Sequence, residues 1–501
     1  MVDSDRLDPR FTALPLDSLA DAALARASAL GASHADVRIE RIRNGIRVLR
    51  DGRLETTTDG TDLGIGVRVI HEGAWGFAAG ITLTTDAAAA LADQAVAAAK
   101  VSRVLSDRPV VLAPEPVHVG DWVSSFRTNP FEVSESDRLG RLTELSDVVA
   151  KGDGVDHVTV MVEMVDESKF YADLAGSRTR QRRVRIHPSV EAVNVARGYS
   201  SMRSCNPPVA RGWEYVADND GWDFDAEVAQ IPGWLAENVA APSVTAGPTD
   251  LVIAPTNLWL TIHESVAHAT ELDRALGYEA AYAGTSFATI DKLGSLKYGT
   301  DIMNVTGDRV TDHGLASVGW DDECVAAQTF DIVRDGTLVG YQLNRQMAHE
   351  QGLGRSNGCA YADSPGHIPL QRMPNVSLHP AADDTSVDDL IGRVENGLFI
   401  EGDKSWSIDM QRYNFQFTGQ RFWSIKDGAI TGQVRDAAYQ ATTTEFWGSM
   451  EAVGGRGTYK LMGALNCGKG QPGQSAPVSH GAPAALFRGI NVLNTEAEGG
   501  N

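Results

Sequence analysis

A segment near the middle of the chain, residues 240–248, limits the folds that this sequence can adopt. It consists of small residues and two prolines, Pro242 and Pro248, and shows no hydrophobic periodicity, which is the composition of a linker. The full chain has 501 residues, well above the usual size of one domain. We therefore expect two domains, residues 1–240 and residues 249–501.

The first half mixes helical and strand-like patterns. Apolar residues recur at helical spacing over Asp17–Leu30, Thr85 can cap an alanine-rich helix that runs to about Leu105, and a third helix is expected over Asp225–Val239. Short runs rich in β-branched residues predict strands, with a turn at Asp51-Gly52. These strands are Val37–Glu40, Ile46–Leu49, Ile65–Val69, Val158–Val165 and Val184–Val195. The N-terminal domain should be of the α+β class, with helices on an antiparallel sheet.

The second half begins with a short apolar strand, Asp250–Ala254, followed by a helical stretch from Thr256 to Leu272. The remainder is rich in turns, and the Asp335-Gly336 and Asp427-Gly428 pairs are typical of β-hairpins. The C-terminal domain should therefore be mostly antiparallel β, barrel-like, and should carry this one helix near its start.

Charge disfavours two classes of partner. Acidic residues outnumber basic ones 66 to 44, and the net charge of -22 would repel nucleic acid and anionic lipid. The densest basic run is Arg178–Arg185, whose alternation fits a strand with one solvated face. The N-terminus lacks an apolar leader, and no stretch approaches the roughly 20 apolar residues that cross a bilayer. We expect a cytoplasmic protein that binds neither nucleic acid nor membranes, with its four widely spaced cysteines reduced.

His263, Glu264 and His268 form the pattern that most resembles a metal site. The histidines are five positions apart, one more than in the H-E-x-x-H zinc helix. On a regular α-helix that spacing places them about 140° apart around the axis, against about 40° for a spacing of four. A π-turn or a helix break near residues 265–267 would bring both imidazoles to one side. Two neutral imidazoles could then bind Zn²⁺ together with a third ligand, and Glu264 could act as general base.

Cys467 is the best candidate for the third ligand. It lies in a glycine-rich turn, where a thiolate would bind zinc and Lys469 would favour its deprotonation. Taken alone, a cysteine of this kind is more often a small buried apolar side chain, and the histidines and glutamate could be ordinary helix residues. The residues by themselves leave both interpretations open.

Several motifs in a fixed order carry a more specific signal. They are His263–Asp273, Val318–Glu323, Arg372–Asn375, Glu395–Gly402 and Cys467–Gln471. In order and spacing they resemble the TldD branch of the TldD/PmbA (TldD/TldE) zinc metallopeptidase family, and the resemblance covers most of the chain, including residues 35–80. Two positions depart from it, because Ala267 and Cys324 stand where glycine is expected.

The resemblance implies a zinc-dependent peptidase that degrades unstructured peptides inside a closed dimeric chamber. It assigns zinc binding to His263, His268 and Cys467 and catalysis to Glu264. The PmbA (TldE) subunit usually lacks these residues and serves as an inactive partner, so this chain should pair with itself or with such a subunit. Two other functions are compatible with the sequence, a non-catalytic PmbA-like partner or scaffold and a hydrolase of another amide. The segment Tyr199–Trp222 predicts no function.

Overall fold

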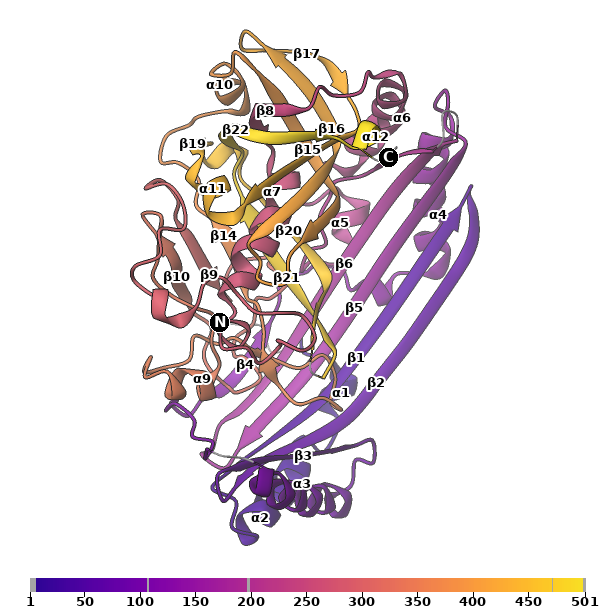
Figure 1. Ribbon diagram of the computed structural model, residues 1–501. Helices are drawn as coiled ribbons and strands as arrows, with labels where there is room; N and C mark the ends of the chain where they lie inside the picture. Colours follow the sequence, from indigo (N-terminus) through magenta and orange to yellow (C-terminus); the bar gives the residue numbers. More distant parts are fainter. Residues whose placement is uncertain (1–5, 106–107, 196–198, 471, 499–501) are drawn as a thin grey trace.

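The computed structural model describes residues 6–105, 108–195, 199–470 and 472–498. Strands from residues 34–203 form one large sheet and strands from residues 247–494 form a second, with helices packed on both, which confirms the α+β class (Figure 1). The second sheet and the smaller sheets around it pack against one side of the first (Figure 1). The division into domains at residues 240–248 stays a prediction.

The first sheet has the strand order β3-β2-β1-β5-β6-β4, with β7 paired to β6, and only the β4–β6 pair is parallel. The two runs Val37–Glu40 and Ile46–Leu49 were expected to be separate strands, but both belong to β1, which pairs with β2 and β5 along its length. Gly45 lies between them without forming a turn, and atoms of Phe131 and Met164 lie where its side chain would be. The strands are β1 (His34–Arg50), β2 (Arg53–His71), β3 (Ala74–Gly80), β4 (Val119–Val123), β5 (His157–Asp173), β6 (Arg178–Asn194) and β7 (Ser200–Arg203).

Two pairs of helices cover this sheet and bury its apolar residues. α2 and α3 pack on β1 and β2, whereas α4 and α6 pack on β5 and β6. The three predicted helices are present, although the hydroxyl that caps α3 is that of Thr84 and not Thr85, since Ala87 N–H donates to it. The helices of this half are α1 (Pro9–Thr12), α2 (Leu16–Ala29), α3 (Thr85–Leu105), α4 (Glu135–Ala150), α5 (Glu214–Ala217) and α6 (Phe224–Ala240).

The second sheet closes into a barrel. Its order is β15-β8-β22-β18-β16-β17, and a further pairing between β15 and β16 joins five of these strands in a ring. Only β8 and β15 run parallel, so the predicted antiparallel, barrel-like architecture is confirmed. The strands of this sheet are β8 (Gly247–Ile253), β15 (Asn396–Ile408), β16 (Asn414–Lys426), β17 (Ala429–Val434), β18 (Ala437–Thr442), β19 (Met450–Val453) and β22 (Ala485–Asn494).

Smaller sheets and short helices surround the barrel. Asp335-Gly336 and Asp427-Gly428 form the predicted hairpin turns, as Asp51-Gly52 does in the first half, and all six residues have positive φ. The remaining strands are β9 (Val305–Asp308), β10 (Thr329–Arg334), β11 (Thr337–Leu338), β12 (Ala360–Tyr361), β13 (Leu370–Gln371), β14 (Asn375–Leu378), β20 (Lys460–Lys469) and β21 (Gln474–Ala482). The helices are α7 (Pro255–Ile262), α8 (Leu272–Ala275), α9 (Arg345–Glu350), α10 (Val387–Ile391), α11 (Thr443–Gly448) and α12 (Thr495–Glu498).

The basic run on β6 is a strand, and its predicted solvated face is limited to its start, where Arg178 and Arg180 are partly exposed. Arg182, Arg183 and Arg185 are buried. They form ion pairs with Asp166 and Glu167 of the neighbouring strand β5. Their charges are therefore neutralised inside the protein and form no basic stripe on its surface.

Buried polar contacts hold the two halves together. Lys169 of β5 lies 2.8 Å from Asp322, and Arg68 of β2 lies 3.2 Å from Glu323. Gln181 of β6 donates to the carbonyl of Trp320. All of the charged partners have less than a tenth of their surface exposed. The Val318–Glu323 motif thus attaches the second half of the chain to the first sheet.

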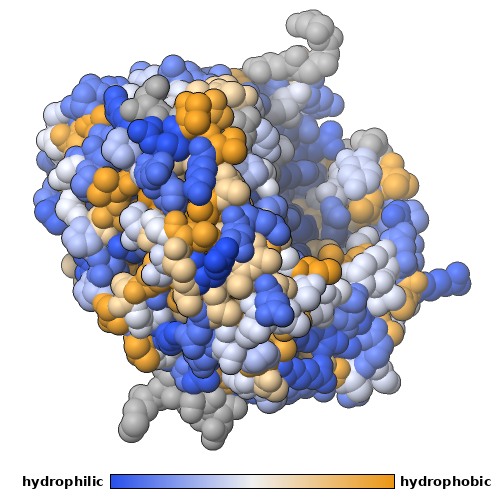
Figure 2. Space-filling model, turned by 90° about the horizontal axis from the view of Figure 1, so that it is seen from below, coloured by the Kyte–Doolittle hydropathy of each residue, from blue (hydrophilic) through white to orange (hydrophobic). Residues whose placement is uncertain are grey.

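Among the described residues, no helix combines the length and the hydropathy that crossing a membrane requires. The four cysteines are free thiols, as expected, and all are buried. Seen from below, the surface mixes hydrophilic and hydrophobic residues, with a hollow between two lobes of the molecule (Figure 2).

Candidate metal centre

The helix that carries both histidines is widened between them. α7 begins with Pro255 and ends at Ile262, and a π-turn follows over His263–Ala267. The backbone N–H of His268 donates to the carbonyl of His263, five residues earlier, which is the hydrogen bond that defines a π-turn. The turn predicted from the histidine spacing is therefore confirmed, and it places both rings on one side of the chain.

Side chains from elsewhere stabilise this widened turn. The carbonyl of Ser265 accepts a hydrogen bond from the Tyr298 hydroxyl, and the carbonyl of Ala267 accepts one from Gln342 Nε2. The hydroxyl of Thr270 donates to the carbonyl of Val266 at 2.8 Å. Buried carbonyls are costly when unpaired, so these three donors offset the loss of regular helical hydrogen bonds.

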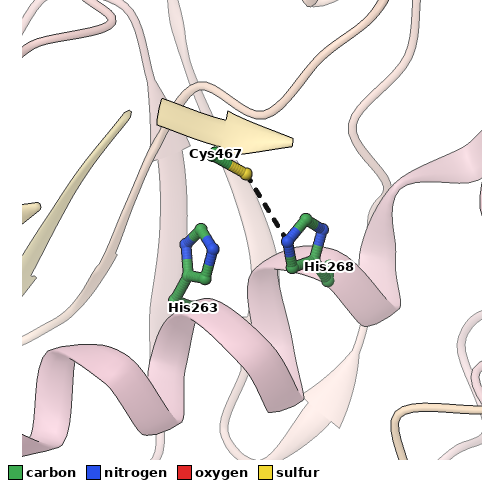
Figure 3. A group of neighbouring side chains, drawn as sticks. All are labelled: His263, His268 and Cys467. Carbon is green, nitrogen blue, oxygen red and sulfur yellow. Dashed lines mark hydrogen bonds between the residues drawn. The ribbon is translucent and has the colours of Figure 1, made fainter. Parts of the chain in front are cut away.

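His263, His268 and Cys467 come together although Cys467 lies about two hundred positions further along the chain. Figure 3 shows the two rings on the widened helix and the sulfur on the neighbouring strand β20. Cys467 Sγ lies 3.5 Å from His268 Nε2, and one ligand atom from each residue lies within 4.8 Å of the others. An irregular register in β20 between Ala464 and Cys467 accompanies this approach. All three side chains are buried.

A third histidine, His480 of β21, fixes the orientation of the His263 ring. His480 Nδ1 lies 3.0 Å from the carbonyl of Val376, which can only accept, so that nitrogen carries the proton. His480 Nε2 then accepts from His263 Nδ1 at 2.7 Å, and His263 Nε2 keeps a free lone pair. Burial is the main cause that lowers the pKa of both rings below the ordinary value, which keeps them neutral. The sequence gives no sign of His480, because this residue stands alone, without a motif.

Glu271 fixes the other imidazole. It accepts from His268 Nδ1 at 2.9 Å, which leaves Nε2 directed at Cys467. Lys469 lies 3.2 Å from Glu271 and 2.8 Å from Asp273, so it anchors these carboxylates. The family-like motifs on the helix and on β20 are thus joined by buried ion pairs, although Gln471, the last residue of the second motif, lies outside the described residues.

The predicted effect of Lys469 on the cysteine is wrong, because Lys469 turns to the carboxylates. Burial by itself would raise the pKa of the Cys467 thiol, but the charges of His268 and Arg372 outweigh it and lower this pKa below its ordinary value. Arg372 also donates to the backbone carbonyl of Cys467. Arg372 therefore has the effect on the Cys467 thiol that was expected of Lys469. It belongs to another family-like motif, Arg372–Asn375.

Glu264 lies beside the cluster, and its carboxylate pairs with Arg412 at 2.7 Å. Burial by itself would raise the pKa of Glu264, but its interactions with the His268 and His263 rings and with the Arg412 guanidinium outweigh burial and lower this pKa. The carboxylate is therefore ionised at neutral pH. Arg412 lies in the turn between β15 and β16 with φ of 63°, and Thr443 Oγ1 donates to its carbonyl. No sequence pattern pointed to Arg412.

A cavity of about 580 Å³, called the site cavity below, opens onto this group. His263, Glu264, His268 and Cys467 all line it. Part of its wall is the segment Arg203–Pro208, within the stretch Tyr199–Trp222 for which the sequence predicted no function. Another part comes from β15 and β20, so both halves of the chain enclose the site.

The two positions that lack the expected glycine behave differently. Ala267 has ordinary helical angles, φ -65° and ψ -52°, so the π-turn does not need glycine there. Cys324 has φ of 59°, in the left-handed region that favours glycine. The glycine of the family pattern is thus explained at position 324, where this chain holds a buried cysteine in the same conformation.

Two family models match the sequence. Residues 246–494 match the PmbA/TldA metallopeptidase C-terminal domain, and residues 35–99 match the PmbA/TldA metallopeptidase domain 1. Among curated relatives, a metalloprotease of Methanothermobacter thermautotrophicus is 27% identical over 92% of this chain and 96% of its own length. A zinc metalloprotease TldD homolog of Saccharolobus solfataricus is 22% identical, over 93% of this chain and 98% of its own.

Solved structures share the fold at lower identity. A putative modulator of a DNA gyrase from Thermotoga maritima superposes with a TM-score of 0.75 at 15% identity, covering 95% of this chain and 100% of that one. TldE from Thermococcus kodakarensis superposes with a TM-score of 0.69 at 14% identity, covering 94% of this chain and 98% of that one. Both family models, the full-length relatives and the shared fold agree. The chain therefore belongs to the PmbA/TldD metallopeptidase family.

Proposed function

We propose that this chain is a zinc-dependent peptidase that hydrolyses peptide bonds in short or unfolded peptides. His263, His268 and Cys467 hold the zinc ion, and Glu264 is the general base. The observation that carries the proposal is the meeting of two imidazoles, a thiol and an ionised glutamate at one cavity, from parts of the chain far apart in sequence. The metalloprotease names of full-length relatives support it.

The side chains fit a zinc ion. Zinc in proteins prefers imidazole nitrogen at about 2.0–2.1 Å and thiolate at about 2.3 Å, and catalytic sites hold it with three protein ligands. The separation of 3.5 Å between Cys467 Sγ and His268 Nε2 suits two ligands of one such ion. The Nδ1 atoms of His263 and His268 are engaged by His480 and by Glu271, so the Nε2 atoms of both rings are available to the metal. A thiolate also favours zinc over magnesium or calcium.

When bound here, zinc would lower the pKa of a water molecule to about 7 and polarise the peptide carbonyl. Glu264 accepts the proton of the attacking water and passes it to the departing amine. Its lowered pKa means that it enters the reaction as the carboxylate. Arg412 holds that carboxylate at the edge of the site cavity and carries a positive charge beside the reacting groups.

His480 is a positioning residue in this proposal, and its removal should weaken zinc binding. His480→Ala leaves His263 Nδ1 without its acceptor, so the ring can rotate or change tautomer. Loss of such a partner typically costs 10- to 100-fold in metal affinity. Titration against a zinc chelator measures the affinity, and His480→Gln, which keeps an acceptor atom, should lose less. Equal zinc affinity in His480→Ala and wild type would contradict this role.

An extended peptide suits the site cavity better than a folded protein does. The cavity lies between two halves of the chain joined by buried ion pairs, and its wall includes β20. Within the described residues β20 pairs with β21 alone. An extended peptide can add to a strand edge of this kind through its backbone, largely independently of its sequence. This supports unfolded segments as substrates.

We further propose that the chain forms a dimer, either with a second copy of itself or with a TldE-like subunit. The partner encloses the site further. The shared fold with TldE from Thermococcus kodakarensis supports a partner of that kind. Light scattering on the chain, alone and mixed with a TldE-like chain, identifies the assembly. A purely monomeric species under both conditions would contradict this part of the proposal.

The substrate class is tested with one small disulfide-bonded protein in two forms, native and reduced with blocked thiols. The unfolded form should be cleaved at least about a thousandfold faster, because a stable native protein exposes unfolded chain for only about 10⁻³ of the time or less. Mass spectrometry of timed samples measures both rates, and Glu264→Gln protein controls for a contaminating protease. Similar rates on the two forms would rule out an enclosed site.

The sequence also allowed a non-catalytic partner or scaffold and a hydrolase of another amide. The convergence of all four proposed functional side chains on one cavity favours a catalyst over a scaffold. Peptides as substrates are supported by the relatives' names, and the cleavage experiment above separates a peptidase from a hydrolase of another amide.

A further inference from the structure

The site cavity has a larger neighbour. A second cavity of about 750 Å³, called the distal cavity here, is lined by α6, by the segment before α10 and by the barrel. Cys205 lines both cavities, so the two are adjacent at this residue. The distal cavity holds none of the proposed zinc ligands, and nothing in the proposed reaction uses it.

Three elements run from one cavity into the other. α7 lines the distal cavity with its first turn and the site cavity with the turns that lead to His263. β15 contributes Glu401 to the distal cavity and Asp403 to the site cavity. β20 contributes Lys460 to the first and Cys467 to the second. Since separate elements all pass through in the same order, the cavities lie end to end.

The length of this path is set by β20. Lys460 and Cys467 are seven residues apart, and a strand rises about 3.3 Å per residue, so the path is about 23 Å long. An extended peptide held beside β20 would cover it with about seven residues. A substrate whose cleaved bond lies at the metal cluster would therefore place a residue about seven positions away in the distal cavity.

The distal cavity is acidic overall. Glu401 and Arg421 neutralise each other at 3.3 Å. The other charged side chains in its wall are four acidic ones and a single basic one. They are Asp223, Glu227, Asp384, Asp388 and Lys460. The two tryptophans of the cavity already face cations of this chain, with Arg421 over Trp234 and Lys460 over Trp222. The excess of carboxylates attracts ammonium and guanidinium groups.

We infer that the distal cavity binds the part of the peptide substrate about seven residues from the cleaved bond and prefers a lysine or arginine there. This inference rests on the proposed peptidase function. It adds a selection by charge that acts far from the metal cluster.

The test measures binding of fluorescent peptides to the zinc-loaded Glu264→Gln protein, which does not consume them. Every peptide contains the same core sequence. The core is tested alone and with seven residues added on its N-terminal or its C-terminal side. The added residues end in either two lysines or two glutamates. When the extension is on one of the two sides, the lysine peptide should bind about three- to tenfold more tightly than the glutamate peptide at low salt. This is the difference in affinity that one or two exposed ion pairs produce.

Asp384→Asn/Asp388→Asn in the same background should reduce this preference. The matched control is Asp17→Asn/Asp21→Asn, which removes two exposed aspartates at the same spacing on α2 and should keep it. Equal affinity for lysine and glutamate peptides on both sides, while the core peptide binds, would overturn the inference alone. Absence of binding for every peptide would overturn the proposed function together with it.

Discussion

Replacing Glu264 by glutamine is expected to lower the rate of peptide cleavage by at least about a hundredfold while the protein keeps its zinc. General acid–base groups typically contribute 10²- to 10⁴-fold to a rate, and glutamine cannot accept the proton of the attacking water. Glutamine is close in size to glutamate and can still accept the hydrogen bond from Arg412, so the local structure should persist. The loss should therefore appear in kcat.

The measurement pairs steady-state cleavage of a short peptide with the zinc content of the same sample. Glu144→Gln, an exposed change of the same kind on α4, serves as control and should match wild type. Glu264→Ala should be as inactive as Glu264→Gln. Cleavage by the zinc-replete Glu264→Gln protein at more than about a tenth of the wild-type rate would assign the base to another residue.

Replacing Cys467 by serine is expected to remove most of the zinc. A serine hydroxyl remains protonated at neutral pH, whereas the charges of His268 and Arg372 lower the pKa of the Cys467 thiol and favour the thiolate that zinc prefers. Wild type should hold about one zinc per chain. The variant should bind zinc at least about a hundredfold more weakly, since loss of a supporting partner alone can cost that much.

Cys205→Ser is the matched control, because Cys205 is also a buried cysteine at the site cavity but lies outside the cluster of three ligands. Elemental analysis and chelator competition report zinc content and affinity, and circular dichroism confirms that both variants fold. Full zinc occupancy at wild-type affinity in Cys467→Ser would remove this residue from the site. Equal zinc loss in both variants would point to damage of the cavity rather than loss of a ligand.

The local features that sequence predicts best are those fixed by spacing or by turn chemistry. A separation of five between His263 and His268 leaves a π-turn or a break as the way for both rings to face one point, and the π-turn is found. Asp-Gly pairs form turns because glycine and aspartate accept positive φ. The break expected between Val37–Glu40 and Ile46–Leu49, where Asn44-Gly45 lies, shows the limit. There the pairing of β1 with two neighbours over its whole length outweighs the local preference for a turn.

The rest of the site depends on contacts between distant segments. His480 and Arg412 each reach the site as single side chains from strands or turns that carry no motif, so spacing cannot reveal them. Lys469 was assigned to Cys467 because the two are neighbours in sequence, but the carboxylates of Glu271 and Asp273 attract it more strongly. Such choices among partners are decided only when the segments pack.

The buried ion pairs between the first sheet and the Val318–Glu323 motif decide how the site cavity can move. A hinge opening between the two halves would separate Lys169 from Asp322 and Arg68 from Glu323. Breaking a buried pair without replacing the partner typically costs about 3–5 kcal/mol, so a conformation that separates both pairs should be rarely populated. The two halves that line the site cavity are therefore expected to move little relative to each other. Under the proposed function, a peptide would then reach the metal cluster through the existing opening, with no gate that has to close.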